Sequence, residues 1–175
     1  MKYNPEKKTE FSVPLALWQV ISKLRENVSE KKQRKGKDGD LRYFFGKFHE
    51  DGFDIAPNKG ILTGYVPTVK ADLTSVTESK PAKDGAGVYS NSFTRLALDM
   101  NMSSGSKAFS VLWSCLCAVL LGLALWLNLA KGFQNNWWTL LIGPVLFIGE
   151  RIACNIGFRV NAHRVVKAIK EMLKE

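Results

Sequence analysis

The sequence predicts an α+β membrane protein, with an N-terminal domain of a strand, a helix and an antiparallel sheet, a two-helix transmembrane hairpin, and a C-terminal amphipathic helix. Three observations support this class. Residues 1–106 are polar and broken by turns, residues 107–158 are dominated by apolar side chains, and residues 159–175 repeat apolar residues at helical spacing. We therefore expect a cytosolic domain, a membrane hairpin and a basic helix over these three ranges.

The N-terminal domain begins with a strand and a helix. Residues 9–13 alternate between polar and apolar side chains, as in a half-buried strand. Pro14 suits a first helical turn, and an apolar stripe then predicts a helix over about 14–29. The charged stretch 30–40 has no interleaved aromatic residues, so its composition favours a solvated loop over a nucleic-acid-binding patch.

Several strands should complete this domain. Residues 43–48 and 53–56 flank a turn and predict a hairpin. Another strand is expected over about 61–69, where Pro67 indicates an edge or a bulge, and residues 74–78 extend the set.

The last predicted strand, residues 93–102, leads almost directly into the apolar part of the chain. Its alternation places one set of side chains on a single face: Leu96, Leu98, Met100 and Met102. One or two helices should cover the resulting curved sheet. A helix-grip arrangement and a pleckstrin-like arrangement both satisfy this order.

Two apolar segments predict the hairpin. Residues 108–130 contain no charge over 23 residues, enough at about 1.5 Å per residue to cover a hydrocarbon core of roughly 30 Å. The second segment, 137–158, is interrupted by Glu150 and Arg151, and we expect this pair near one membrane interface, in a structural or a functional role. Pro144 should kink the second helix.

Charge and aromatic residues predict the orientation. Trp137 and Trp138 follow the short link between the two segments and are typical of a membrane interface. Basic residues gather on the opposite side, where we expect four of them to contact lipid head groups: Arg159, Arg164, Lys167 and Lys170. The positive-inside rule then places both termini in the cytoplasm, at a plasma (inner) membrane, and the net charge of +9 is better explained by lipid than by nucleic acid.

Small residues recur every fourth position in both segments, and such stripes let helices approach closely. They predict contact either within the hairpin or between copies in a homo-oligomer, and they are Ser110, Ser114, Ala118 and Gly122 in the first segment and Gly149, Ala153 and Gly157 in the second. Beyond the hairpin, residues 159–175 form an amphipathic helix. It should pack on the sheet or lie on the bilayer, and a modest sheet's need for a covering helix favours packing.

Signatures of catalysis are missing from the sequence. No HExxH, GxSxG, phosphate-binding loop or GxGxxG motif is present, and His49, Glu50 and Asp51 fall in a predicted turn. The three cysteines all lie in the apolar half without further ligands nearby. We therefore expect no enzyme activity, no cofactor and no metal site.

The pattern Phe45-Gly46, Phe53-Asp54-Ile55 and Pro67, followed by a strand and a membrane hairpin, resembles small uncharacterised bacterial membrane proteins. That resemblance implies no activity. Two functions are open: a membrane-anchored binding or sensory module with a protein or small-molecule ligand, and an oligomeric membrane effector controlled by its soluble domain, in bacterial defence or stress.

Overall fold

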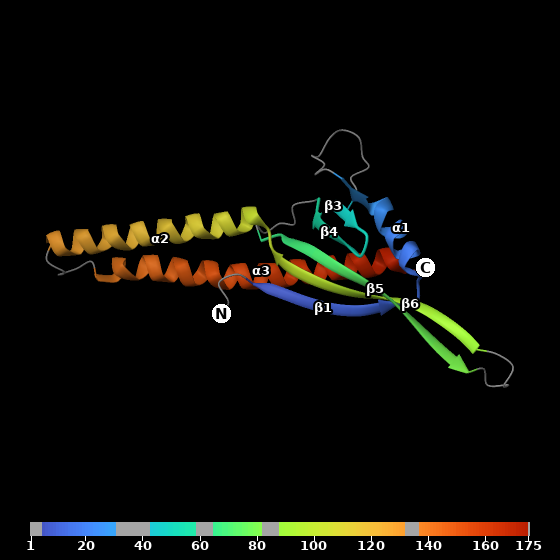
Figure 1. The fold of residues 1–175 in the computed structure, drawn as a ribbon. Helices are drawn as coiled ribbons and strands as arrows, with labels where there is room; N and C mark the ends of the chain where they lie inside the picture. Colours follow the sequence, from blue (N-terminus) through green and yellow to red (C-terminus); the bar gives the residue numbers. More distant parts are fainter. Residues whose placement is uncertain (1–4, 31–42, 59–64, 82–87, 132–136, 175) are drawn as a thin grey trace.

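The computed structural model describes residues 5–30, 43–58, 65–81, 88–131 and 137–174. The charged stretch 31–42, the beginning of the strand expected over 61–69, and the link between the apolar segments lie outside these residues. Figure 1 shows the elements, which in chain order are β1 (Glu6–Val13), α1 (Leu17–Asn27), β2 (Val28–Ser29), β3 (Phe44–His49), β4 (Gly52–Pro57), β5 (Pro67–Pro81), β6 (Val88–Met102), α2 (Ser104–Lys131), the 3-10 helix η1 (Trp137–Leu141) and α3 (Ile142–Leu173).

The strands form one mixed sheet in the order β1-β6-β5-β4-β3-β2. All neighbours are antiparallel except β2 and β3, which are parallel. The first strand pairs with the last: β1 runs along β6 from Glu6 opposite Asn101 to Val13 opposite Thr94. The element order of an α+β protein is therefore confirmed, with the two long apolar helices following the sheet.

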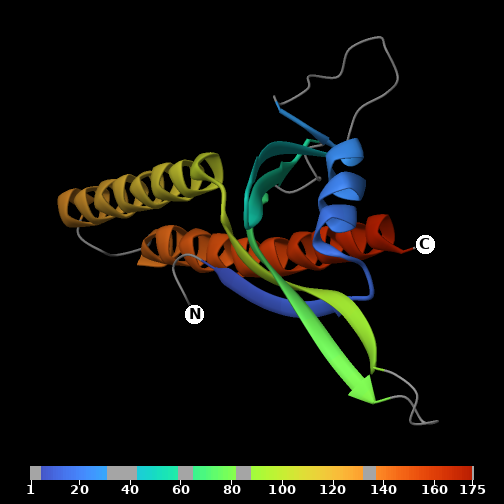
Figure 2. The same ribbon diagram turned by 45° about the vertical axis from the view of Figure 1, so that its right-hand side comes forward.

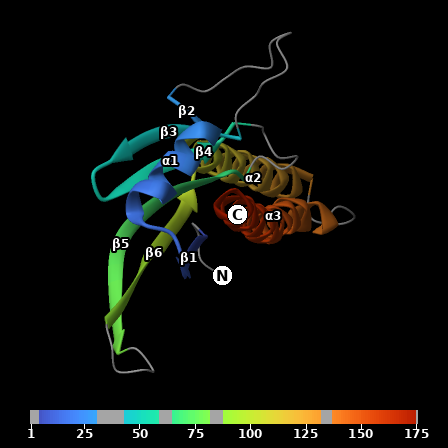
Figure 3. The same ribbon diagram turned by 90° about the vertical axis from the view of Figure 1, so that its right-hand side faces the viewer.

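The sheet buries one face against two helices. On β6, the predicted alternation is confirmed, because Leu96, Leu98 and Met100 are each at most 2% exposed. α1 and the second half of α3 pack against the same apolar core. Viewed along α3, the sheet curves round one side of that helix, with α1 beside it (Figure 3).

α3 is a single helix of 32 residues, about 48 Å long, and this continuity corrects the expected boundary after residue 158. Its first half runs beside α2, whereas its second half lies along the sheet (Figure 2). Phe158, Val165 and Ile169 from that second half are each at most 2% exposed in the core. One continuous helix is therefore shared by the hairpin and the sheet.

Two helix boundaries differ from the sequence prediction. α1 begins at Leu17, with Ala16 as its N-cap, so Pro14 precedes the helix instead of starting it. Pro144 does not kink a longer helix. It lies in the first turn of α3, directly after η1, where a missing N–H leaves no helical hydrogen bond unmade.

The strand expectations also need one correction. Residues 67–69 of the first expected segment and all of 74–78 belong to one strand, β5, whose first residue is Pro67. Proline is tolerated at that position because the first residue of a strand need not donate to the ladder.

By length and composition, two helical stretches are apolar enough to cross a membrane, Ser104–Ala130 and Trp137–Leu173, and most of their apolar surface is exposed.

Candidate functional site

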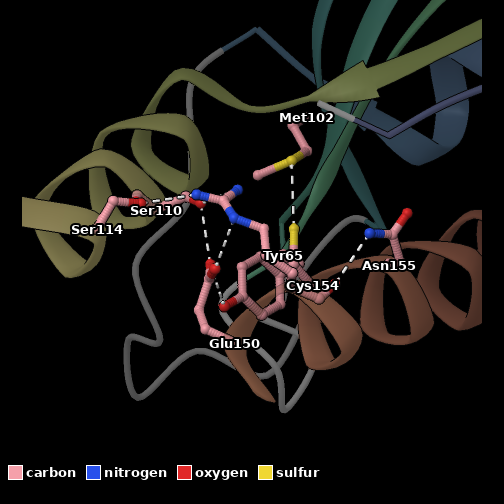
Figure 4. A network of polar contacts seen from close by, with 8 residues as sticks. Tyr65, Met102, Ser110, Ser114, Glu150, Cys154 and Asn155 are labelled. Carbon is pink, nitrogen blue, oxygen red and sulfur yellow. Dashed lines mark hydrogen bonds and ion pairs between the residues drawn. The ribbon is translucent and has the colours of Figure 1, made fainter. Parts of the chain in front are cut away.

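A buried cluster of polar side chains lies where the sheet meets the hairpin (Figure 4). Glu150 and Arg151 of α3 are each 8% exposed, although both are ionisable. Glu150 Oε1 accepts hydrogen bonds from Tyr65 Oη at 3.1 Å and from Ser110 Oγ at 2.9 Å. Glu150 Oε2 lies 3.2 Å from Arg151 Nε in an ion pair. We call these residues, with Ser114, the junction cluster.

The guanidinium of Arg151 ties α3 to α2. Its Nη1 donates to Ser110 Oγ at 2.9 Å and its Nη2 donates to Ser114 Oγ at 2.7 Å. The ring of Phe147 lies 5.0 Å below the same guanidinium carbon. A fork with several fixed partners offsets part of the desolvation that burial of the charge imposes.

Tyr65 ties the cluster to the sheet domain. Its hydroxyl donates a hydrogen bond to Glu150. Its backbone carbonyl accepts one from Asn161 Nδ2 at 3.0 Å, and Asn161 lies about three helical turns beyond Glu150 on α3. Burial first, and then the negative charge and hydrogen bond of Glu150, raise the pKa of Tyr65 to about 12. Beside it, the thiol of Cys154 donates to Met102 Sδ at 3.7 Å. The end of the sheet is thus fixed to the middle of α3.

The two hairpin helices pack through small residues spaced seven apart. Ser110, Cys117 and Ala124 of α2 are each at most 9% exposed. On α3, Gly143 faces α2 so closely that an added Cβ would lie 3.0 Å from the carbonyl oxygen of Cys117. At the far end, Asn128 Nδ2 donates to Thr139 Oγ1 at 3.0 Å.

The small residues singled out from their four-residue spacing mostly point elsewhere. Ala118, Gly122, Gly149 and Ala153 are exposed, and an added Cβ at either glycine would meet nothing within 4 Å. A four-residue step turns about 40° round a helix, so a stripe of four positions drifts about 120° off the contact face. The prediction of contact within the hairpin is therefore wrong for these four residues. Ser114 and the buried Gly157 do face the interior. Contact between copies stays a prediction.

The aromatic and basic residues assigned to lipid occupy two different places. Trp137 and Trp138 are exposed at the start of η1, at the far end of the hairpin. Lys170 instead packs on the sheet, with its Nζ 4.9 Å from the centre of the Phe11 ring of β1. It lies about 18 Å along α3 beyond Phe158, where the predicted membrane segment ends. Arg159, Arg164 and Lys167 are exposed on the same half of α3. Arg164 and Lys167 line a groove. All four basic residues belong to α3 and not to a separate surface helix.

That groove, which we call the β3–α3 groove, has a volume of about 360 Å³. The sheet side of the groove is lined by Tyr43, Phe44 and Pro57, and its α3 side is lined by Arg164, Val165, Lys167, Ala168 and Glu171. No sequence pattern indicated it, because its two walls are more than a hundred residues apart. A second, shallower depression of about 780 Å³ surrounds the β3–β4 turn.

The second depression holds the histidine considered in the sequence. His49 Nε2 lies 3.5 Å from Asp54 Oδ2, and Lys70 Nζ lies 4.0 Å from the same oxygen, with all three side chains at least partly exposed. Within the described residues, no group of three or more His, Cys, Asp and Glu side chains could hold a metal ion. This depression is a solvated surface of mixed charge.

Comparison of the chain with protein-family models, with curated proteins and with solved structures gave no match. The chain's own contacts therefore carry the assignment of function. They provide one continuous helix that is shared by the hairpin and the sheet, a polar cluster at their junction, and a groove on the sheet-packed half of that helix.

Proposed function

We propose that the protein is a membrane-anchored cytosolic binding or sensory module without catalytic activity. The observation that carries the proposal is the continuity of α3 from the hairpin into the core of the sheet. A ligand in the β3–α3 groove contacts α3 directly, so any shift of the helix against the sheet also moves its hairpin half. The curved single sheet round a long C-terminal helix supports the helix-grip alternative over the pleckstrin-like one.

The membrane belongs to the same proposal. Apolar side chains cover the outside of the hairpin, with Trp137 and Trp138 at its far end and the sheet domain at the other. Both termini would then be cytoplasmic, at the inner membrane of a bacterium. In intact cells, a membrane-impermeant maleimide should label a cysteine introduced at Trp137 and leave one introduced at His49 unlabelled. Labelling of both, or of His49 alone, contradicts this orientation.

Native mass spectrometry of the full chain released from gentle detergent tests the binding function. We expect a monomer or dimer that carries a reproducible additional mass. Ala168→Trp should remove this mass because the indole fills the β3–α3 groove, and His163→Trp should keep it because His163 is exposed on the same helix outside the groove. A chain without bound mass, or a mass that both variants retain, contradicts the proposal.

One observation favours a second function, an oligomeric membrane effector that assembles into a pore or perturbs the bilayer in bacterial defence or stress. Ala118, Gly122, Gly149 and Ala153 face outward from the hairpin, and small outward residues allow close contact with another copy. Because a side chain at Gly122 or Gly149 meets nothing in its own chain, a change there acts on contacts between copies.

The doubly substituted chain Gly122→Leu, Gly149→Leu tests this second function. If copies associate through these faces, the wild-type chain gives a discrete higher oligomer in native mass spectrometry and depolarises the membrane on overexpression. The double variant should then lose both properties and retain its fold. A wild-type chain that stays monomeric and leaves membrane potential intact excludes the effector.

A further inference from the structure

The β3–α3 groove combines an apolar floor with a charged rim. Phe44, Pro57 and Val165 form the floor and are buried, and the half-buried Ala168 completes it. Tyr43 stands at the edge with 63% of its surface exposed. Its ring and that of Phe44 lie 5.9 Å apart between centroids, at 45° to each other. A surface of this kind suits a flat apolar group.

The walls are held in place before any ligand arrives. The backbone N–H of Asn58 donates to the carbonyl of Tyr43 at 2.9 Å, and Ser29 Oγ donates to the carbonyl of Phe44 at 3.3 Å. Val165, from α3, is 2% exposed within the core. A prearranged site loses less conformational entropy on binding, which favours affinity.

The rim carries two basic side chains, Arg164 and Lys167, and one carboxylate, Glu171, so its net charge is positive. Arg164 and Lys167 are exposed on successive turns of α3, and Lys167 Nζ forms an ion pair with Glu171 Oε1 at 3.8 Å. Arg164 makes no hydrogen bond or ion pair with the part of the chain that the structure describes. Its planar fork is therefore available to an oxyanion, for which two parallel N–H donors are the best partner.

We propose that the β3–α3 groove binds a small organic anion, with a flat apolar body on the Phe44, Pro57 and Val165 floor and a carboxylate or phosphate at Arg164 and Lys167. This inference rests on the proposed binding function and names its ligand class. A volume of about 360 Å³ suits a small molecule more than a folded partner. A neutral ligand leaves the guanidinium unused, and a cationic ligand meets repulsion from Arg164, whose charge no carboxylate of the rim offsets, whereas Glu171 offsets that of Lys167.

The probe is 1-naphthyl phosphate, titrated by calorimetry into the full chain in lipid nanodiscs, with 1-naphthol and inorganic phosphate as its two halves. We expect saturable binding of the ester, with each half at least tenfold weaker. Arg164→Gln should weaken binding at least tenfold, whereas Arg159→Gln, which removes an exposed arginine outside the groove, should not change it. Ala168→Trp should abolish binding, and His163→Trp should preserve it.

Lys167→Glu keeps the test decisive should Ala168→Trp fail to fold, because Lys167 is exposed and its charge reversal should weaken the ester at least tenfold. Absence of ester binding, equal binding of 1-naphthol, or indifference to Arg164→Gln overturns the organic-anion assignment. If native mass spectrometry still finds a mass that Ala168→Trp removes, the binding function stands and only the ligand class falls. A released acidic peptide in that experiment also overturns the small-molecule class.

Discussion

Glu150 and Arg151 neutralise each other inside the junction cluster, so each one depends on the other's charge. Glu150→Ala leaves a buried guanidinium without its counter-charge, and Arg151→Ala leaves a buried carboxylate. Either change should destabilise the folded chain by about 3–5 kcal/mol. Replacing both residues by leucine removes both charges, so the double variant should be less destabilised than either single variant.

Thermal unfolding of the three variants in one detergent, followed by circular dichroism, checks this order. Lys167→Ala serves as a control, since it removes one partner of an exposed ion pair that contributes little. A double variant whose loss equals the sum of the two single losses means that the two charges act independently and that the pair is not the organising contact.

Tyr65 should be detectable by its late ionisation. Its pKa of about 12 exceeds the value near 10 of a tyrosine in an unfolded chain. The folded form therefore holds its proton more tightly, and this contribution to stability is complete below pH 10 and is lost as pH rises from 10 towards 12.

Absorbance at 295 nm, titrated for the wild-type chain and for Tyr65→Phe, isolates this ionisation as the difference between the two curves. Glu150→Gln should move the difference curve to lower pH, because it removes the negative charge beside the phenol. A difference curve centred near pH 10 contradicts the contact between Tyr65 and Glu150.

For single residues, the sequence identified the ionisable pair of the junction cluster but did not predict its hydrogen-bonding partners. Glu150 and Arg151 stand out because an otherwise apolar segment contains them. Ser110 and Ser114 were identified as small residues, whereas they act as hydrogen-bonding partners of Arg151. Tyr65 is 85 residues from Glu150, and no periodicity relates positions on a loop to positions on a distant helix.

At the scale of elements, Gly143 and Gly122 separate the two possible uses of small residues in the hairpin. An added Cβ at Gly143 lies 3.0 Å from the Cys117 carbonyl oxygen and 3.2 Å from Leu121 Cβ, so Gly143→Ala should force α2 and α3 apart and cost about 1–3 kcal/mol. Gly122→Ala meets nothing within 4 Å and should stabilise the helix by about 0.5–1 kcal/mol.

Unfolding midpoints of the two alanine variants in the same detergent measure this difference, and each glycine serves as the control for the other. A destabilised Gly122→Ala chain together with an unaffected Gly143→Ala chain means that the helices pack through the opposite face.

The sequence predicted which helices and strands exist better than it predicted where they begin and end. Alternation placed the inward face of β6 correctly, because a half-buried strand repeats every second residue. Ser110 and Ser114 do lie between the two helices, as the sequence predicted. The rest of the hairpin interface was missed because the prediction used four-residue spacing, whereas nearly parallel or antiparallel helices keep contact at seven-residue spacing, where the drift is only about 20°. Gly143 and Glu150, which are seven residues apart and both contact α2, carried that signal in the second segment.

For the whole molecule, the order of the elements places the hairpin between the last strand of the sheet, β6, and the half of α3 that packs on that sheet. β6 ends at Met102, and α3 returns past it, with Cys154 Sγ 3.7 Å from Met102 Sδ. The sequence predicts a boundary after residue 158 because the hydropathy changes there. Helical hydrogen bonding does not depend on that change, so one helix continues from an apolar setting into the core of the sheet.

This path predicts which parts of the chain can fold without the hairpin. A chain of residues 1–103 lacks the α3 side chains that fill the core, among them Phe158 and Ile169, and should remain unfolded in water. A chain in which residues 108–149 are replaced by a short glycine-serine linker keeps those side chains. Its two cut ends, Lys107 and Glu150, lie close together, since Ser110, less than one helical turn after Lys107, has its Oγ 2.9 Å from Glu150 Oε1 in the full chain, so this chain should fold as a soluble domain.

Circular dichroism and the dispersion of amide proton resonances in NMR spectra of both chains give the comparison. The linker chain should show mixed helix and strand signals with dispersed resonances, and the short chain should show neither. A folded 1–103 chain means that the sheet closes its core without α3, which removes the physical link between groove and hairpin. A disordered linker chain means instead that α2 and the first half of α3 are part of the folding core, so that the hairpin and the sheet are one cooperative unit.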